Sequence, residues 1–399
     1  MKILILHKSM VLGGTEKVLL NYLNILAKNH HITLLLTHDL AEQAFFQEGI
    51  PNDISVYSVF NQNDIRRYSH ISAQRRKSLW HKIRHEAFKG YEQWRYYHAL
   101  RRLIAQKNID LIIDFSGCLD KFIRLPSVLR YGFPPTLRWV HGRLQSQNAH
   151  EPDAATRLKF HRILTRHSGV VGICPEMSLR IQHTFNLPAD KIHTQPNPID
   201  LNEIEQKAAQ ALPETVQQLR PYILQTARLD TGKGHEELIE IYAKIKQRGI
   251  THKLCFLGEG NNRAVLEAKI HDLGLQNDCL LLGAHRNPYP FFKHADLFVH
   301  TSEHEGLPTV LLESMACGTP VVAMDCPTGP KDILGADSRY GRLIPMHNQQ
   351  AFADAVVELL TNRTQHQHYA AQGKQRATDF SADSIGAQLE TLLKKFIAH

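Results

Sequence analysis

Residues 299–324 read VHTSEHEGLPTVLLESMACGTPVVAM, and this stretch determines how the rest of the chain is organised. The apolar run at 296–300 predicts a strand that leads into a polar turn. A helix is expected to begin near Pro308, because proline is well tolerated in the first helical turn, where its missing N–H is no loss. Gly318 and Pro320 should end this helix before a second apolar strand. Strand, turn, helix and strand in this order are typical of a parallel α/β sheet.

Two glutamates flank the start of this helix: Glu305 lies just before it and Glu313 about one and a half turns inside. A helix N-terminus offers free N–H groups and a positive dipole end, which suit an anion. A carboxylate can accept hydrogen bonds from both hydroxyls of a vicinal diol. An anion site between two diol acceptors predicts a sugar nucleotide, and the alternative is a pair of solvated surface glutamates. The residues expected to line the anion site are Gly306, Leu307, Pro308 and Thr309.

The spacing of Glu305 and Glu313, with seven residues between them and ACGTPVV after them, resembles the signature of the retaining glycosyltransferases of family 4. The stretch DCPTGPKDIL at 325–334 is similar to the same region of bacterial lipopolysaccharide and glycan-assembly members. The resemblance implies the GT-B fold, in which two doubly wound α/β domains face each other across a cleft. It also implies that Glu313 holds the ribose hydroxyls and that Glu305 is a catalytic residue holding the sugar and distal phosphate.

A glycine-containing loop, ARLDTGKG, follows the predicted strand Tyr222–Thr226 and carries Arg228 and Lys233. In the family, the equivalent arginine and lysine grip the donor diphosphate, where cations stabilise the leaving group as it becomes anionic. The alternative is two surface cations in a loop. The resemblance also places His285 near the nucleobase. Because the sequence contains no Asp-x-Asp motif, we expect metal-independent transfer with no cofactor besides the nucleotide-sugar donor.

The chain begins with a predicted strand, Lys2–His7, followed by a Gly13-Gly14 loop and apolar residues at helical spacing. This order is typical of the first unit of a doubly wound α/β domain. The loop lacks the G-x-G-x-x-G pattern of nicotinamide-binding proteins. The resemblance implies that Gly13 and Gly14 approach the donor diphosphate, and the alternative is a tight turn.

His141 ends another predicted strand, at 136–141, on the edge where open α/β sheets bind ligands. The resemblance places this histidine near the donor sugar and the acceptor as a catalytic residue. The alternative is a purely structural histidine.

A length of 399 residues predicts two domains. We expect an acceptor-side domain at 1–196, a hinge or linker at 197–220 and a donor-binding domain at 221–379. The resemblance implies that 380–399 packs back on the first domain. The six cysteines are scattered without a C-x-x-C pair, which indicates reduced thiols rather than a disulfide framework or a zinc site.

Positive charge is concentrated at 65–102, which holds eleven lysines and arginines against two glutamates, while the whole chain has a net charge of +8. A local basic patch predicts an anionic partner. We expect this segment to be largely helical and to meet an anionic membrane surface. The alternatives are a helix that packs its aromatic residues on its own domain, and cations that meet acceptor phosphates. The aromatic residues suited to an interface are Trp80, Tyr91, Trp94, Tyr96 and Tyr97.

The sequence shows neither a signal-peptide pattern nor an apolar run of about 20 residues. We therefore expect a cytoplasmic enzyme, peripheral on the inner membrane, that moves a hexose or N-acetylhexosamine from a UDP-sugar. The expected acceptor is a lipid-linked or phosphorylated glycan, namely the core of lipopolysaccharide or lipo-oligosaccharide.

Two other classes stay open. A sugar-nucleotide epimerase shares the fold and would turn over the donor without an acceptor. A nucleic-acid-binding protein would use 65–102 for phosphates but would leave the two glutamates unexplained, so we expect no nucleic-acid partner.

Overall fold

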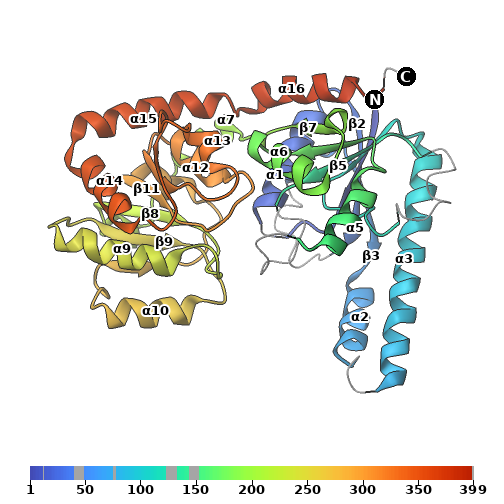
Figure 1. Ribbon diagram of the computed structural model, residues 1–399, viewed down its shortest axis with the longest axis horizontal. Coiled ribbons are helices and arrows are strands. Elements are labelled where there is room, and N and C mark those ends of the chain that lie inside the picture. The colour runs from blue at the N-terminus through green and yellow to red at the C-terminus, as the bar shows by residue number, and fades with distance from the viewer. Residues whose placement is uncertain (12, 40–48, 75–77, 123–132, 143–151, 398–399) are drawn as a thin grey trace. The chain divides into compact units, whose positions relative to one another are not determined.

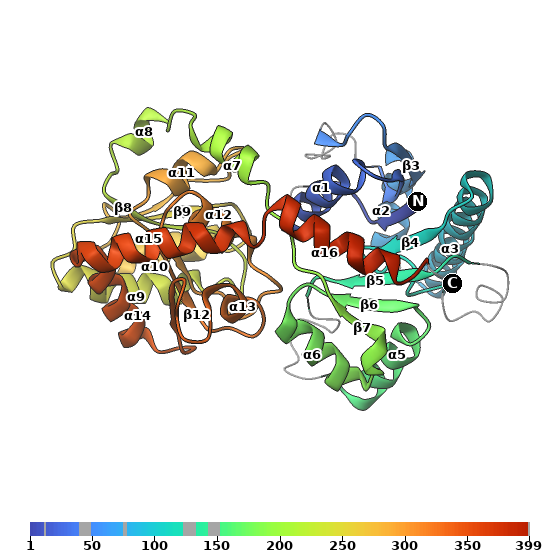
Figure 2. The same ribbon diagram turned by 90° about the horizontal axis from the view of Figure 1, so that it is seen from above.

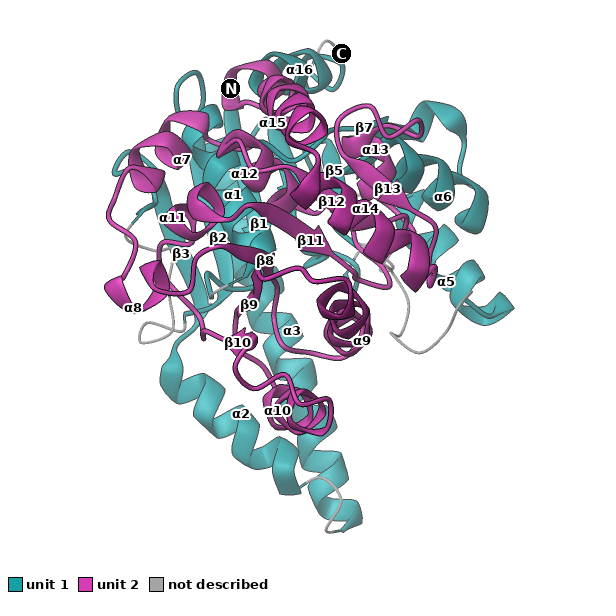
Figure 3. Ribbon diagram, turned by 90° about the vertical axis from the view of Figure 1, so that its left-hand side faces the viewer, with its two compact units in different colours: residues 1–198, 386–399 teal, residues 199–385 magenta. Residues whose placement is uncertain are grey.

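The computed structural model describes residues 1–11, 13–39, 49–74, 78–122, 133–142 and 152–397. The chain divides into two compact units, which Figure 3 shows in different colours. Unit 1 is Met1–Pro198 with Gly386–His399, and unit 2 is Ile199–Ile385. Each unit contains a parallel sheet with flanking helices, which confirms the predicted α/β fold class with two doubly wound domains.

The sheet of unit 1 has the order β3-β2-β1-β4-β5-β6-β7, and every pairing is parallel. Its strands are β1 (Lys2–His7), β2 (His31–His38), β3 (Ser55–Phe60), β4 (Leu111–Asp114), β5 (Thr136–Val140), β6 (Gly169–Gly172) and β7 (Ile192–Thr194). The helices are α1 (Gly14–Leu26), α2 (Gln62–Gln74), α3 (Leu79–Lys107), α5 (Ala154–Leu164), α6 (Pro175–Phe185) and the 3-10 turn η3 (Ala189–Lys191). Most residues of the inner strands are apolar, because parallel strands are covered on both faces, and the buried Asp114 and Arg138 are exceptions.

Helices α2 and α3 form a hairpin that projects from the sheet (Figure 1). Ser78 caps the start of α3 by accepting a hydrogen bond from the His81 N–H, and Asn108 ends it in a left-handed conformation. Only the second half of α3 reaches the core of unit 1, through Tyr96, Leu100 and Leu103. Among the described helices, α3 included, none is long and apolar enough to cross a membrane.

The prediction that Tyr96 is available to an interface is wrong. Its side chain is only 3% exposed, and its ring stacks on Phe122 with centroids 5.3 Å apart. The reason is helical register, because Tyr96 shares one face with Leu100 and Leu103 at i+4 and i+7. Tyr97 is half-buried, whereas Trp80, Tyr91 and Trp94 are exposed.

The sheet of unit 2 has the order β10-β9-β8-β11-β12-β13, again wholly parallel. Its strands are β8 (Tyr222–Thr226), β9 (Lys253–Leu257), β10 (Cys279–Leu281), β11 (Leu297–His300), β12 (Val321–Met324) and β13 (Arg342–Ile344). Its helices are α7 (Leu201–Ala208), α8 (Glu214–Gln217), α9 (His235–Gln247), α10 (Arg263–Asp272), α11 (Tyr289–His294), α12 (Thr309–Ala316), α13 (Pro330–Leu334), α14 (Gln349–Thr361) and α15 (Arg363–Thr378).

The segment 197–220, predicted as a hinge or linker, is for the most part integrated into unit 2. Helix α7 packs on α11 and α12, and Ile204 and Val216 are buried. Asn287 donates a hydrogen bond of 2.9 Å to the carbonyl oxygen of Lys207. The segment is mostly polar, so its composition did not indicate that a few apolar side chains anchor it to unit 2.

Helix α16 (Ala382–Lys394) carries the chain back into unit 1, where it runs beside α1 (Figure 2). Gly386 approaches Ile25, and Glu390 Oε1 lies 2.8 Å from His30 Nε2. Leu389 and Leu393 are fully buried. Unit 2 ends at Ile385 and unit 1 resumes at Gly386, a few residues after the expected 380.

Candidate active site

The strand order of unit 2 reverses between β8 and β11, since β9 lies on one side of β8 and β11 on the other. Open α/β sheets bind ligands at such a reversal, outside the carboxyl ends of the strands. The loop after β8 carries Arg228 and Lys233, and the loop after β11 carries Glu305. The topology therefore brings together residues that are 72 positions apart in the chain.

The two loops are fixed to each other through backbone contacts. Gly234 has a φ of +70°, and a Cβ atom there would overlap the carbonyl oxygen of Thr301. The Thr301 hydroxyl donates a 2.8 Å hydrogen bond to the Gly234 carbonyl oxygen, and the Glu303 N–H donates a 3.0 Å bond to Gly232. Glycine at 234 is thus required both by the conformation and by the close approach of the second loop.

A third loop, between β12 and α13, holds the backbone of Glu305 from the other side. The Glu305 N–H donates to the Pro327 carbonyl oxygen at 3.3 Å, and the Thr328 hydroxyl donates to the Glu305 carbonyl oxygen. Gly329, with a φ of +98°, lets this loop approach Pro308. The backbone of Glu305 is therefore fixed by hydrogen bonds to this loop.

The Glu305 carboxylate is 16% exposed and has two cationic or polar neighbours. Lys233 Nζ donates a 2.6 Å hydrogen bond to Oε1, and His300 Nε2 lies 3.4 Å from the same oxygen. Burial raises the pKa of this carboxyl group, but the hydrogen bond from His300 and the charge of Lys233 outweigh burial and lower the pKa to about 2. Glu305 is consequently ionised at any physiological pH.

The remaining predicted residues of unit 2 lie on neighbouring elements. Arg228 is 71% exposed and pairs with Asp230 at 3.1 Å, so its guanidinium extends into solvent. Glu313 is half-buried on α12, and its charge adds to burial in raising the pKa of Tyr289 on α11. His285 is exposed, with its ring centroid 4.6 Å from that of Phe291.

The predicted anion-binding residues surround the start of α12. Pro308 is the residue that precedes the helix, and Thr309 is its first residue. Leu307 and Pro308 are buried, whereas Gly306 and Thr309 are half-buried. A helix with Pro308 at its first position would begin one residue before α12, which begins at Thr309.

Unit 1 has its own reversal of strand order between β1 and β4, and the predicted residues of this unit lie near it. Gly13 precedes α1, and Gly14 is its first residue. Just after β5, the ring centroid of His141 lies 4.2 Å from that of Phe115. Burial, together with the nearby His7 and Arg138, lowers the pKa of His141 to about 3, so this imidazole is neutral.

Sequence reasoning missed two groups beside these residues. His7, at the end of β1, is 2% exposed and contacts the Ser116 hydroxyl through Nδ1. Its Nε2 lies 3.4 Å from Glu16 Oε1, in the first turn of α1. A Cβ on Gly13 would overlap the Glu16 carboxylate, which gives this glycine a local role. A histidine at the carboxyl end of a buried strand was the signal available in the sequence.

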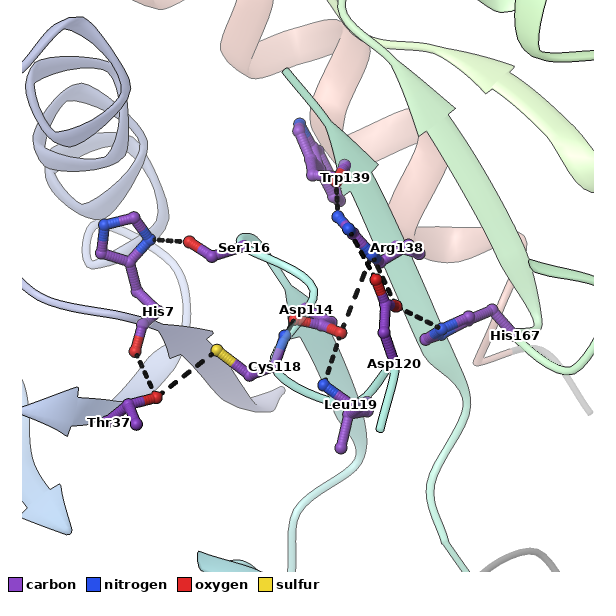
Figure 4. A network of polar contacts seen from close by, with 10 residues as sticks. All are labelled: His7, Thr37, Asp114, Ser116, Cys118, Leu119, Asp120, Arg138, Trp139 and His167. Carbon is purple, nitrogen blue, oxygen red and sulfur yellow. Dashed lines mark hydrogen bonds and ion pairs between the residues drawn. The ribbon is translucent and has the colours of Figure 1, made fainter. Parts of the chain in front are cut away.

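A buried ionic network lies deeper in unit 1 (Figure 4). Arg138 donates two 3.0 Å hydrogen bonds to Asp120 and lies 4.0 Å from the fully buried Asp114. His167 lies 3.8 Å from Asp120. Asp114, Asp120 and His167 have spacing that a metal ion could use, but the guanidinium of Arg138 already occupies both oxygens of Asp120. This arrangement fits a structural ion pair that joins β4 to β5.

Residues 207–376 match the family described as glycosyl transferases, group 1. This matched segment lies entirely within unit 2 and contains Arg228, Lys233, Glu305 and Glu313.

Comparison with known proteins gives relatives over part of the chain. The N-acetylgalactosamine-N,N'-diacetylbacillosaminyl-diphospho-undecaprenol 4-alpha-N-acetylgalactosaminyltransferase of Campylobacter jejuni is 34% identical over 201 residues, which are 50% of this chain and 53% of that protein. The lipopolysaccharide core biosynthesis glycosyltransferase LpsE of Rhizobium meliloti is 30% identical over 177 residues, 44% of this chain and 50% of LpsE. The chain thus spans about half the length of these curated relatives.

A solved structure matches nearly the whole chain. HepE of Anabaena in complex with UDP superposes with a TM-score of 0.72 at 20% identity, covering 99% of this chain and 100% of HepE. At this identity the likeness shows the fold alone. The chain therefore has the GT-B fold that the sequence predicted.

Proposed function

We propose that this chain is a retaining glycosyltransferase that moves a hexose or N-acetylhexosamine from a UDP-sugar to a bacterial cell-envelope glycan. The observation that carries the proposal is an ionised Glu305 held beside Lys233, just before α12 and at the carboxyl ends of the paired strands β8 and β11. Support comes from the family match at 207–376, from the names of the relatives, and from UDP in the HepE structure.

The two oxygens of Glu305 have different surroundings. Lys233 and His300 both face Oε1, and in the described part of the chain no hydrogen bond is donated to Oε2. A carboxylate oxygen accepts hydrogen bonds, so we assign Oε2 to a hydroxyl of the donor sugar. Lys233 and the solvent-exposed Arg228 supply positive charge for the diphosphate, while Glu313 accepts hydrogen bonds from the ribose hydroxyls.

Transfer requires breaking the bond between the anomeric carbon and the diphosphate oxygen while the acceptor oxygen forms a new bond on the same face. The departing phosphate takes the proton of the acceptor hydroxyl, so no protein base is needed. Lys233 and Arg228 stabilise the charge that develops on the leaving group. With these cations in place we propose that the reaction needs no metal ion. His285 is assigned to the nucleobase, Gly13 and Gly14 to the diphosphate and His141 to the sugar and acceptor.

The test separates the two glutamates by what each touches. Glu313→Gln should weaken UDP binding measured by calorimetry, whereas Glu305→Gln should leave UDP binding unchanged and reduce transfer. Glu303→Gln is the matched control, because Glu303 is exposed and only two residues from Glu305. Equal loss of UDP affinity in both variants would refute the assigned roles. Conversion of the donor to its epimer without an acceptor would instead identify an epimerase.

We propose further that α3 attaches the protein to an anionic membrane surface. Trp80, Ile83, Tyr91 and Trp94 recur at helical spacing on one face and are 78%, 52%, 49% and 57% exposed. Amphipathic rings between basic side chains suit the headgroup region of a bilayer. The exposed cations of this helix are Lys82, Arg84, Arg101 and Arg102. The residues Arg75, Arg76 and Lys77, also assigned to this surface, lie outside the described residues.

The membrane assignment gives the acceptor its location, at the cytoplasmic face of the inner membrane. A lipid-linked glycan would be presented at that surface, and the Campylobacter relative is named for a diphospho-undecaprenol acceptor. The Rhizobium relative is named for the lipopolysaccharide core, which we propose as the acceptor here.

Liposome flotation tests this surface. Changing Lys82 and Arg84 together to Gln should weaken binding to anionic vesicles by about 2 kcal/mol, or roughly 30-fold, at about 1 kcal/mol per cation. The control pair is Lys159 and Arg162, which are exposed on α5, changed in the same way. Equal flotation of both double variants, or none by the wild type, would refute a membrane role for α3.

A further inference from the structure

His300 is a buried polar residue at the end of an apolar strand. The other residues of β11, Leu297 to Val299, are fully buried hydrophobics, and His300 itself is 1% exposed. Its Nδ1 has no hydrogen-bond partner among the residues that the structure describes. A buried polar group costs free energy unless it is hydrogen-bonded, so its presence here calls for a role that an apolar side chain cannot fill.

A polar contact of the ring with a described residue points to that role. His300 Nε2 lies 3.4 Å from Glu305 Oε1, and a carboxylate can only accept. A ring that hydrogen-bonds this oxygen must therefore carry a proton on Nε2 and donate it to Glu305. The same interaction contributes to the low pKa of Glu305. Because the ring is packed in the core and has two side-chain torsions, this donor is more fixed in position than the Lys233 ammonium.

Lys233 has two competing partners in the proposed reaction. It pairs with Glu305 at 2.6 Å, and it is also the cation assigned to the donor diphosphate. When the ammonium turns to the diphosphate, its hold on Glu305 weakens. His300 then remains as the donor that keeps Oε1 in place and Oε2 directed to the sugar.

We propose that His300 is a positioning residue for Glu305, acting through the Nε2–H···Oε1 contact to orient the carboxylate that binds the donor sugar. The proposal rests on the proposed function, because it takes Glu305 as the sugar ligand. It assigns to His300 no contact with the substrate. The two neighbours of Glu305 then have different roles. Lys233 stabilises the leaving group, and His300 orients the Glu305 carboxylate.

The experiment compares His300→Leu with His300→Gln. Leucine fills a similar volume without a donor, whereas the glutamine amide can still donate an N–H toward Oε1. The probes are UDP and the tightest binder among UDP-glucose, UDP-galactose and UDP-N-acetylglucosamine. The readouts are calorimetric affinity for UDP and for the UDP-sugar, kcat for UDP release, and Tm.

His300→Leu should lower kcat roughly 10- to 100-fold, as for loss of a hydrogen bond to a charged group, and should weaken the UDP-sugar more than UDP. His300→Gln should recover most of both losses. His235→Leu is the matched control, since His235 is also buried, at the start of α9, with its ring centroid 5.2 Å from that of Phe256. It should lower Tm without changing the ratio of the two affinities.

The outcomes distinguish a failure of the His300 assignment from a failure of the proposed function. A His300→Leu protein with wild-type kcat and affinities but a lower Tm would show a purely structural histidine and overturn the proposal. A glutamine variant as impaired as the leucine variant would also overturn it. If the wild type binds none of these UDP-sugars and releases no UDP from them, the proposed function itself fails, whatever the variants do.

Discussion

Lowering the pH should destabilise unit 2 through Glu305. The pKa of this carboxyl group is about 2 in the folded protein, against an ordinary value of 4.5. Because the folded pKa lies below the unfolded one, the stabilisation is fully present above pH 4.5 and is lost as the pH falls toward 2. The shift corresponds to about 3 kcal/mol in total, of which about 2 kcal/mol is lost by pH 3.

The perturbation is Glu305→Gln, which removes this titration while keeping the shape of the side chain. Other carboxyl groups also titrate in the same range, so the informative quantity is the difference between the wild type and the variant. The wild type should lose about 2 kcal/mol more than the variant between pH 6 and pH 3. Glu303→Gln, at an exposed neighbour, should behave as the wild type does.

The assay is urea denaturation at each pH, with a short deuterium pulse at one fixed pH and mass spectrometry of peptides from β8 and β11. These strands flank the site, so their labelling reports the unfolding of unit 2. All three tryptophans, Trp80, Trp94 and Trp139, lie in unit 1, and their fluorescence provides an internal reference. Equal losses in the wild type and in Glu305→Gln would show that Glu305 is not held in its ionised form by Lys233 and His300.

Three further predictions follow from contacts described above. Gly234→Ala should lower the free energy of unfolding by more than about 2 kcal/mol in urea denaturation, because it adds a backbone clash to the penalty for positive φ. Gly249→Ala, at a φ of +83° with open space around it, should lower it by only about 1 kcal/mol. Lys233→Ala should lower kcat by about 10²- to 10³-fold in the UDP-release assay, and wild-type activity should survive EDTA; complete loss on chelation would contradict metal-independent transfer. Arg138→Met should destabilise unit 1 by about 3–5 kcal/mol by tryptophan fluorescence, because it leaves the buried Asp114 and the half-buried Asp120 without their cation, and a change below about 1 kcal/mol would contradict the assigned network.

The strand and helix around Glu305 could be predicted because their signals are local. Apolar runs, a proline and a glycine at fixed spacing determine β11, α12 and β12 without reference to the rest of the chain. The contact between Lys233 and Glu305 could not be predicted in this way, because the two residues are 72 positions apart in the chain. It depends on β8 pairing with β11 rather than with another strand, and pairing order is a property of the whole sheet.

Three differences between the sequence interpretation and the structure have the same physical origin. Tyr96 was counted among the interface aromatic residues because of its residue type, whereas the register of α3 places it in the core. The segment 197–220 was read as a linker from its polar composition, although Ile204 and Ala208, one helical turn apart, anchor it. His300 was read as the end of an apolar strand, and only the fold shows that Glu305 lies within its reach. In each case the outcome depends on which residues pack together in the fold. Amino-acid composition does not give this information.

The return of the chain to unit 1 through α16 affects how the protein is made. Unit 2 is one continuous stretch and can fold as soon as it leaves the ribosome, but unit 1 needs residues 386–397 to cover the surface around Ile25 and His30. Nearly two hundred residues are synthesised in between, which takes roughly 10–40 s at usual elongation rates. During that interval the first 198 residues expose the apolar surface that Leu389 and Leu393 later bury. Synthesis of unit 1 thus starts before that of unit 2 and finishes after it, and the uncovered surface is available to nascent-chain chaperones throughout that interval.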